Sequence, residues 1–337
     1  MASIELKAFT QQKDGESYSN QDRFAVNIGK RRFAVADGVS NSYHPEITAE
    51  TLCHEFISGD YAIDDWPTYF KNYAYDNICS YWNDEVYDIE SELDELDLEH
   101  ATLKRQKLPD GASTFVGMEI NALLKEISFY IVGDSCLFLV ADDKPLQTFC
   151  TSQFIEQGNQ RFYRFDRHTN AVVVNQVDKD VQWLSGKLTI NSGFLFLMTD
   201  GAAKWFQDEM VKNHNVVNSL WQMDGHDQFE LLVQSCREQS MMDDDITIIL
   251  LKFDEGWDAE IVPRVIDVWE WYPENLIQLR QEKKASELSQ EPQTVSESPS
   301  QPMVPVINET EHSWIVSWFT YLKTKIRNLW MMIFGQE

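Results

Sequence analysis

The sequence predicts an α+β domain in which helices flank a central antiparallel β-sandwich, followed by a disordered linker and an amphipathic C-terminal helix. Short segments rich in β-branched and aromatic residues follow one another with too little chain between them for crossover helices, which indicates antiparallel pairing. A few longer segments carry apolar residues at helical spacing. Near residue 280 the composition turns polar, and one short apolar segment follows.

The N-terminal part predicts three strands and two helical regions. The segments IELKAF, RFAVNI and RRFAVAD alternate as strands do, and a tight turn at Gly29 and Lys30 joins the last two. Pro45 suits the first turn of a helix that continues through EITAETLCHEFI. A longer helical region is expected from about Trp66 to Gln106, with a solvated acidic face. One apolar face of its middle part carries Val86, Ile89, Leu93 and Leu96.

Further strands are expected in STFVGMEI, EISFYIVGD, CLFLVAD, FLFLMTD and DITIILLKF, with a helix in DQFELLVQSCREQS between the last two. Because many antiparallel strands accompany few long helices, two packed sheets with helices outside them are the simplest arrangement. We expect this domain to cover residues 1–255 and a helical extension to cover 256–280.

The C-terminal part has a different character. Residues 281–311 are rich in Ser, Gln, Glu and Pro and poor in apolar residues, which predicts a disordered linker. Residues 312–334 predict an amphipathic helix, with Lys323, Lys325 and Arg327 off its apolar stripe. Each basic residue near its middle would cost a membrane span about 2.5 to 3.5 kcal/mol. Contact with a membrane surface is favoured, docking on a protein is the alternative, and a span is least favoured.

The charge balance excludes a nucleic-acid partner. The chain has 28 Lys and Arg against 55 Asp and Glu, a formal net charge of -27, whereas nucleic-acid surfaces are basic. The 5 cysteines are odd in number and form no CxxC pair, which favours a reducing compartment. The N-terminal segment MASIELKAFT lacks the apolar run of a signal peptide. We therefore expect a cytoplasmic protein, either free or peripheral at the inner face of the membrane.

Aspartates stand at one end of four predicted strands. They are Asp37 after RRFAVA, Asp134 after FYIVG, Asp200 after FLFLMT, and the triplet Asp243, Asp244 and Asp245 before ITIILL. Strand ends from both sheets of a sandwich meet at one edge, where such carboxylates repel one another unless a cation neutralises them. Mg²⁺ and Mn²⁺ prefer oxygen ligands of this kind. The glycines after Asp37 and Asp200 are expected to let the chain turn sharply and to expose a carbonyl.

A centre of this kind supplies metal-assisted hydrolysis. Two ions about 3.5 to 4 Å apart can share a bridging hydroxide and stabilise charge on a phosphoryl group attacked in line. No Ser, Cys or His nucleophile is then needed. One aspartate alone would only cap a turn, but four in matching positions favour the metal site.

An ordered series of short motifs carries a family resemblance. The motifs are NQD at Asn20–Asp22, ADGVSNS from Ala36, GAST at Gly111–Thr114, VGDS at Val132–Ser135, LMTDG ending at Gly201 and DDIT at Asp244–Thr247. In this order they resemble the PPM family, the type 2C metal-dependent protein phosphatases, and are most similar to the compact bacterial-type branch. The resemblance covers roughly the first 255 residues. Each motif is weak by itself, whereas the ordered set is specific.

The resemblance implies two Mg²⁺ or Mn²⁺ ions at one end of the sandwich, with a third in some members. By motif position, Asp37 would bridge the two metals and the carbonyl of Gly38 would bind one of them. Asp200 and Asp244 would complete the first site.

Two more aspartates acquire roles in this way. Asp134 would form the third-metal site together with Asp200, and Asp22 would act near the second metal through waters. A one-residue slip within the 243–245 triplet would make a neighbour of Asp244 the ligand.

The chain also departs from the family pattern. Many members have an Arg shortly before the acidic motif to bind phosphate, whereas the segment KDGESYSNQD offers only Lys13, which lies too far upstream. Gln21 stands in place of a Glu, Val39 in place of a His, and Cys136 in place of an Arg. His44 lies nearby, as either a structural residue or a proton donor.

The resemblance implies a phosphatase for phosphoserine and phosphothreonine in proteins, with catalytic roles for Asp22, Asp37, Asp200 and Asp244. Its partner would be a phosphoprotein, either a Ser/Thr kinase or the target of one. The alternative is a pseudophosphatase, a regulatory binding module that keeps the fold. Gln21 and the missing Arg favour this alternative.

Overall fold

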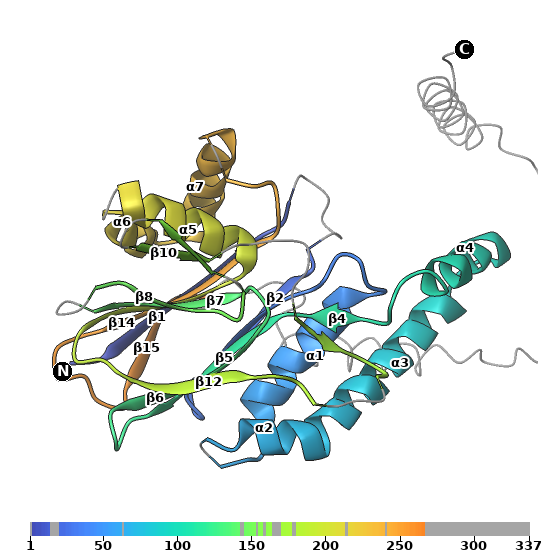
Figure 1. Ribbon diagram of the computed structural model, residues 1–337, viewed down its shortest axis with the longest axis horizontal. Coiled ribbons are helices and arrows are strands. Elements are labelled where there is room, and N and C mark those ends of the chain that lie inside the picture. Colours follow the sequence, from blue (N-terminus) through green and yellow to red (C-terminus); the bar gives the residue numbers. More distant parts are fainter. Residues whose placement is uncertain are drawn as a thin grey trace, which may run out of the picture. The chain divides into compact units, whose positions relative to one another are not determined.

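A computed structural model describes residues 2–13, 20–62, 64–141, 145–152, 154–157, 160–163, 170–176, 180–212, 215–239 and 241–266. All of them belong to the first of two units, Met1–Ala285. They form two packed, mainly antiparallel sheets with helices on both outer faces (Figure 1), which confirms the predicted sandwich. Among these residues, no helix has the length and apolar character of a membrane span.

The larger sheet has six strands in the order β15-β1-β14-β13-β7-β8. Their bounds are β1 Ile4–Gln11, β7 Cys136–Ala141, β8 Gln147–Phe149, β13 Gly193–Met198, β14 Ile246–Phe253 and β15 Ile261–Ile266. The register pairs Gln11 with Ile246, and Met198 with both Ile248 and Cys136. The end of β13 and the starts of β7 and β14 therefore lie at the same edge.

The second sheet has five strands in the order β12-β6-β5-β3-β2. Their bounds are β2 Asp22–Asn27, β3 Arg32–Asp37, β5 Phe115–Asn121, β6 Glu126–Val132 and β12 Leu184–Thr189. The register pairs Asp22 with Asp37, and Phe115 with Val132. Two smaller pairs complete the strands, β4 Ala112–Ser113 with β11 Val172–Val173 and β9 Phe154–Gln157 with β10 Gln160–Tyr163.

Side chains of both sheets form the core between them, as the alternation of apolar residues predicts. The members from β2, β3 and β6 include Phe24, Phe33, Val35 and Ile131, and those from β13 and β14 include Leu195, Leu197, Ile249 and Leu251. All are buried. This shared core fixes the strand ends of both sheets relative to one another.

Helices cover the outer faces. On the side of β2 and β3 lie α1 Pro45–Ser58, α2 Trp66–Tyr69, the π-helical segment η1 Phe70–Ala74, α3 Tyr75–Ser91 and α4 Glu95–Arg105. On the side of β14 lie α5 Asp200–Lys212, α6 Val216–Gln222 and α7 His226–Gln239 (Figure 1).

The helical region expected from Trp66 to Gln106 is confirmed, but it is not one regular helix. A π-helical segment interrupts it after Tyr69, and a new helix begins after Asp94, whose side chain accepts a hydrogen bond from the N–H of Asp97 at 2.9 Å. The predicted apolar face is also only partly used, because Val86 is buried while Leu96 is 61% exposed. Helix α4 therefore packs little against the domain.

The helical extension expected over residues 256–280 is wrong for its described part. Residues 261–266 form strand β15, which pairs in parallel with β1. The β-branched residues of this segment suit a strand, and the edge of β1 offered unpaired backbone groups. Residues 267–280, the predicted linker 281–311 and the predicted helix 312–334 lie outside the described residues.

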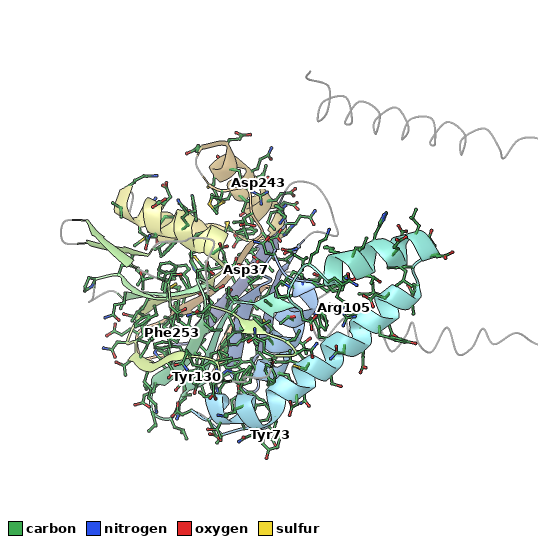
Figure 2. The ribbon with its side chains drawn as sticks, turned by 45° about the vertical axis from the view of Figure 1, so that its right-hand side comes forward. Asp37, Tyr73, Arg105, Tyr130, Asp243 and Phe253 are labelled. Atoms are coloured by element: carbon green, nitrogen blue, oxygen red, sulfur yellow. The ribbon has the colours of Figure 1, made fainter. Side chains whose placement is uncertain are left out.

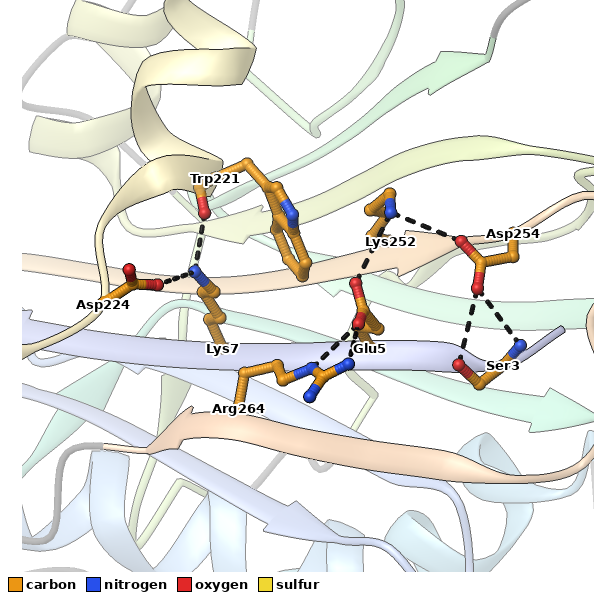
Figure 3. Close-up of polar contacts among 8 residues, drawn as sticks. All are labelled: Ser3, Glu5, Lys7, Trp221, Asp224, Lys252, Asp254 and Arg264. Atoms are coloured by element: carbon orange, nitrogen blue, oxygen red, sulfur yellow. Dashed lines mark hydrogen bonds and ion pairs between the residues drawn. The ribbon is translucent and has the colours of Figure 1, made fainter. Parts of the chain in front are cut away.

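A buried lysine ties β1 to α6. The Nζ atom of Lys7 donates a hydrogen bond to the carbonyl of Trp221 at 2.6 Å (Figure 3). It donates another to the carbonyl of Met223 at 2.7 Å. These carbonyls lie at the C-terminal end of α6, where the last carbonyls of a helix lack helical partners. Asp224 lies 3.3 Å from Nζ, but its side chain is exposed. The carbonyl bonds therefore contribute more than the ion pair.

We expect Lys7→Met to lower the free energy of unfolding by roughly 1.5 to 3 kcal/mol, because hydrogen bonds from a charged group are lost. Urea denaturation measures this change. Lys252→Met is the matched control, since Lys252 makes partly exposed ion pairs with Glu5 and Asp254 and should cost less than about 1 kcal/mol. Equal losses in the two variants would contradict the assignment.

Candidate metal centre

The predicted aspartates converge at one end of the sandwich. β2 begins at Asp22 and β3 ends at Asp37, directly opposite. Asp134 lies in the turn between β6 and β7, and Asp200 is the first residue of α5, just beyond β13. Figure 2 shows Asp37 between the two groups of helices.

Three of these carboxylates form a compact group. One oxygen from each of Asp37, Asp134 and Asp200 lies within 4.8 Å of the others. Asp37 and Asp200 are together, as the sequence predicts for the first site. The third member of the group is Asp134, which was expected beside Asp200 in a third-metal site.

Asp244 lies just before β14 and interacts electrostatically with these carboxylates. Its charge raises the pKa values of Asp22, Asp37 and Asp200. Its Oδ1 atom accepts a hydrogen bond from the N–H of Asp245 at 3.0 Å, which fixes the carboxylate.

The other two members of the triplet have different partners. The carboxylate of Asp245 accepts hydrogen bonds from the N–H groups of Lys13 at 2.8 Å and Gln21 at 2.6 Å. Asp243 lies 3.6 Å from the Nε atom of Arg237. These contacts favour Asp244 over both neighbours as a ligand.

The pKa values of the carboxylates at this end of the sandwich are raised. Burial is the largest cause at Asp22, Asp37 and Asp200, and repulsion from neighbouring aspartates adds to it. The pKa of Asp200 rises to about 7, and those of Asp22 and Asp37 lie well above their ordinary value. A divalent cation would offset this repulsion, and its preference for carboxylate oxygens matches the donors present. The residues therefore fit the implied metal.

A buried hydroxyl network holds Asp22, which is 1% exposed. The hydroxyl of Thr199 donates to Oδ2 of Asp22 at 2.7 Å and accepts from the N–H of Thr247 at 3.0 Å. The side-chain carbonyl of Asn20 accepts from the N–H of Asp22 at 2.9 Å. Sequence reasoning gave Thr199 no role, although it stands beside Asp200 in the motif LMTDG.

The glycines beside two of the aspartates are closely surrounded by other atoms. Positive φ angles among the described glycines occur at Gly133, Gly193 and Gly256, and not at Gly38 or Gly201. A Cβ on Gly38 would lie 2.9 Å from the carbonyl oxygen of Gln21, and one on Gly201 would lie 2.9 Å from Cδ1 of Ile246. After Asp200 the chain enters helix α5 directly.

The positions that depart from the family pattern have local partners. The side-chain oxygen of Gln21 accepts a hydrogen bond from the hydroxyl of Ser40 at 2.8 Å. The Nδ1 atom of His44 lies 2.8 Å from a carboxylate oxygen of Glu46, at the start of α1, which favours the structural interpretation of His44. Cys136 is buried at the start of β7.

We expect Mn²⁺ to stabilise the wild-type chain and so to raise its melting temperature. At a free Mn²⁺ concentration 100 times the Kd, binding should add about 2.7 kcal/mol to the free energy of unfolding. Asp37→Asn should remove most of this gain, because the variant lacks a carboxylate of the compact group. Scanning calorimetry with Mn²⁺ or EDTA measures both. Asp208→Asn on the exposed side of α5 is the control and should keep the gain. An unchanged Mn²⁺ response in Asp37→Asn would contradict the site.

Without metal, stability should fall as pH rises. The pKa of Asp200, about 7, is higher than in the unfolded chain, so the folded state holds a proton that the unfolded state has released. Stability therefore decreases as the pH rises from about 4 to about 7 and then levels off. Melting temperatures in EDTA should show a steeper fall for the wild type than for Asp200→Asn. Parallel curves would contradict the raised pKa.

Comparison with known proteins identifies the family of the chain. A family profile described as Protein phosphatase 2C matches residues 12–247. A search of curated protein sequences finds no match. Among solved structures, serine/threonine phosphatase Stp1 from Staphylococcus aureus has 16% identity and a TM-score of 0.48, covering 75% of this chain and 96% of that one. The S. agalactiae serine/threonine phosphatase has 18% identity and a TM-score of 0.48, with 74% and 100% covered. Because the profile spans well over half of the sequence, the chain belongs to the protein phosphatase 2C family.

Proposed function

We propose that this protein hydrolyses phosphoserine and phosphothreonine in other proteins with the help of two Mn²⁺ or Mg²⁺ ions, and a third in some states. The observation that carries the proposal is the convergence of Asp37, Asp134 and Asp200 within 4.8 Å at one end of the sandwich. Membership of the protein phosphatase 2C family supports the same reaction.

Different aspartates would hold different ions. Asp37, Asp200 and Asp244 would hold the first ion, and Asp37 with the carbonyl of Gly38 would hold the second. Asp134 and Asp200 would hold a third. Bound divalent cations supply Lewis-acid stabilisation of the phosphoryl group and lower the pKa of the attacking water.

Asp22 would place its carboxylate beside the second ion and act through waters. One oxygen of Asp22 accepts a hydrogen bond from Thr199, so the carboxylate has a fixed direction. These ligands come from strand ends and from the first residue of a helix, which are rigid positions. Rigid support of this kind keeps reacting groups in productive geometry.

A pseudophosphatase is the second candidate, and one contact favours it. Gln21 stands where a carboxylate would add charge, and its side-chain oxygen is bonded to the hydroxyl of Ser40. The protein would then bind phosphoproteins without hydrolysing them.

The proposed function also implies a location and partners for the protein. A phosphoprotein would be the substrate, either a Ser/Thr kinase or a target of one, in the cytoplasm or at the inner face of the membrane. Residues 312–334 would contact a membrane surface or a partner protein.

Flotation of the full chain with anionic liposomes, compared with a truncation at about residue 280, distinguishes these contacts. Equal flotation of both would exclude the membrane surface.

We expect Mn²⁺-dependent release of phosphate from a phosphothreonine peptide and from p-nitrophenyl phosphate. Asp37→Ala should lower kcat by more than roughly 100-fold, because even the loss of a partner of a metal ligand costs roughly 10 to 100-fold. Asp208→Asn should retain activity. If the wild type binds Mn²⁺ tightly but releases no more phosphate than Asp37→Ala does, the enzyme is excluded and the pseudophosphatase is favoured.

A further inference from the structure

Arg237 reaches the segment that carries Asp244 from outside the metal centre. It lies on α7, and its side chain is 17% exposed. Its Nη2 atom donates hydrogen bonds to the carbonyl of Asp244 at 2.5 Å and to the carbonyl of Gln12 at 3.0 Å. Its Nε atom lies 3.6 Å from Oδ1 of Asp243. One guanidinium therefore joins a helix to the ends of two strands.

The carbonyls of Gln12 and Asp244 lie just beyond the sheet, where no N–H group of a paired strand is available to them among the described residues. The ladder between β1 and β14 ends at the pair Gln11 and Ile246. Gln12 and Asp244 lie just beyond that pair, on opposite chains. A planar guanidinium can serve two acceptors at once, which an ammonium group does less well.

The same segment is held from its inner side by Asp245. The carboxylate of Asp245 accepts hydrogen bonds from the N–H groups of Lys13 and Gln21, and the N–H of Asp245 donates to Oδ1 of Asp244. Asp244 is thus fixed at its carboxylate by Asp245 and at its carbonyl by Arg237. Loss of either contact would let this peptide rotate and move the carboxylate.

We propose that Arg237 is a positioning residue for the metal centre. It holds the carbonyls of Gln12 and Asp244, directs the Asp244 carboxylate toward Asp37 and Asp200, and so sets the affinity for one bound ion. Its polar contacts are with Gln12, Asp243 and Asp244, so it acts through the segment that carries Asp244. The inference rests on the proposed function only in taking Asp244 as a metal ligand.

Titration of the full chain with Mn²⁺, followed by electron paramagnetic resonance, tests this inference. In Arg237→Met, the affinity for one ion should fall by roughly 10 to 100-fold, the cost of losing a partner of a metal ligand. Arg237→Lys can serve one carbonyl and should show a smaller fall. The Mn²⁺ concentration for half-maximal activity should rise by the same factor, while kcat at saturating Mn²⁺ and KM for the phosphopeptide stay unchanged.

Two controls separate this role from a general loss of stability. Arg264→Met on β15 removes an arginine that pairs with Glu5, and its Mn²⁺ affinity should equal that of the wild type. In an Asp244→Asn background, Arg237→Met should cause no additional loss of affinity, because the two residues act through one carboxylate.

Wild-type Mn²⁺ affinity in Arg237→Met, even with a lower melting temperature, would overturn the inference. An additive loss in the double variant would also overturn it. If Arg237→Met does not fold, Arg237→Lys supplies the same comparison. If the wild type lacks phosphatase activity but Arg237→Met still lowers the Mn²⁺ affinity, the proposed function is refuted and this inference stands. If the wild type is active but Arg237→Met leaves the Mn²⁺ affinity unchanged, the proposed function stands and this inference is refuted.

Discussion

The arrangement at the end of the sandwich depends on one electrostatic constraint, the close approach of several buried or partly buried carboxylates. Asp22 and Asp37 come from one sheet, while Asp134 and Asp200 lie where the chain enters or leaves the other. Burial and mutual repulsion raise the pKa values of Asp22, Asp37 and Asp200, so the charged forms of these three are unfavourable without a counter-charge. Strongly perturbed carboxylates of this kind cluster at functional sites. A fold that places them at one point is suited to divalent cations.

The surrounding polar contacts give these carboxylates fixed directions. Thr199 bonds to Asp22 and receives the N–H of Thr247, which links the two sheets beneath the site. Asp245 bridges two backbone N–H groups and positions its neighbour Asp244. A metal centre depends on such supporting partners nearly as much as on its ligands. The bonds of Thr199 with Asp22 and Thr247 join both sheets beside the carboxylates.

Much of the fold followed from local pattern. Alternation of apolar residues predicted the strands, and the antiparallel sandwich is confirmed. The predictions that failed depended on contacts between distant segments. Residues 261–266 form a strand because β1 offers an open edge, and α4 exposes Leu96 because no neighbour covers that face among the described residues. Periodicity reports which residues prefer burial, but only the packed fold supplies the surface that buries them.

The sequence by itself determined the kind of chemistry, because aspartates at the ends of apolar strands and their ordered motifs are local features. Tertiary structure decided which of them meet. Asp37, Asp134 and Asp200 form the compact group because strand register brings together positions that lie far apart in the chain. It also decided that Gly38 and Gly201 serve by their small size, since neighbouring atoms occupy the space a side chain would need. Such crowding has no signature in a linear sequence, because the crowding atoms come from other elements.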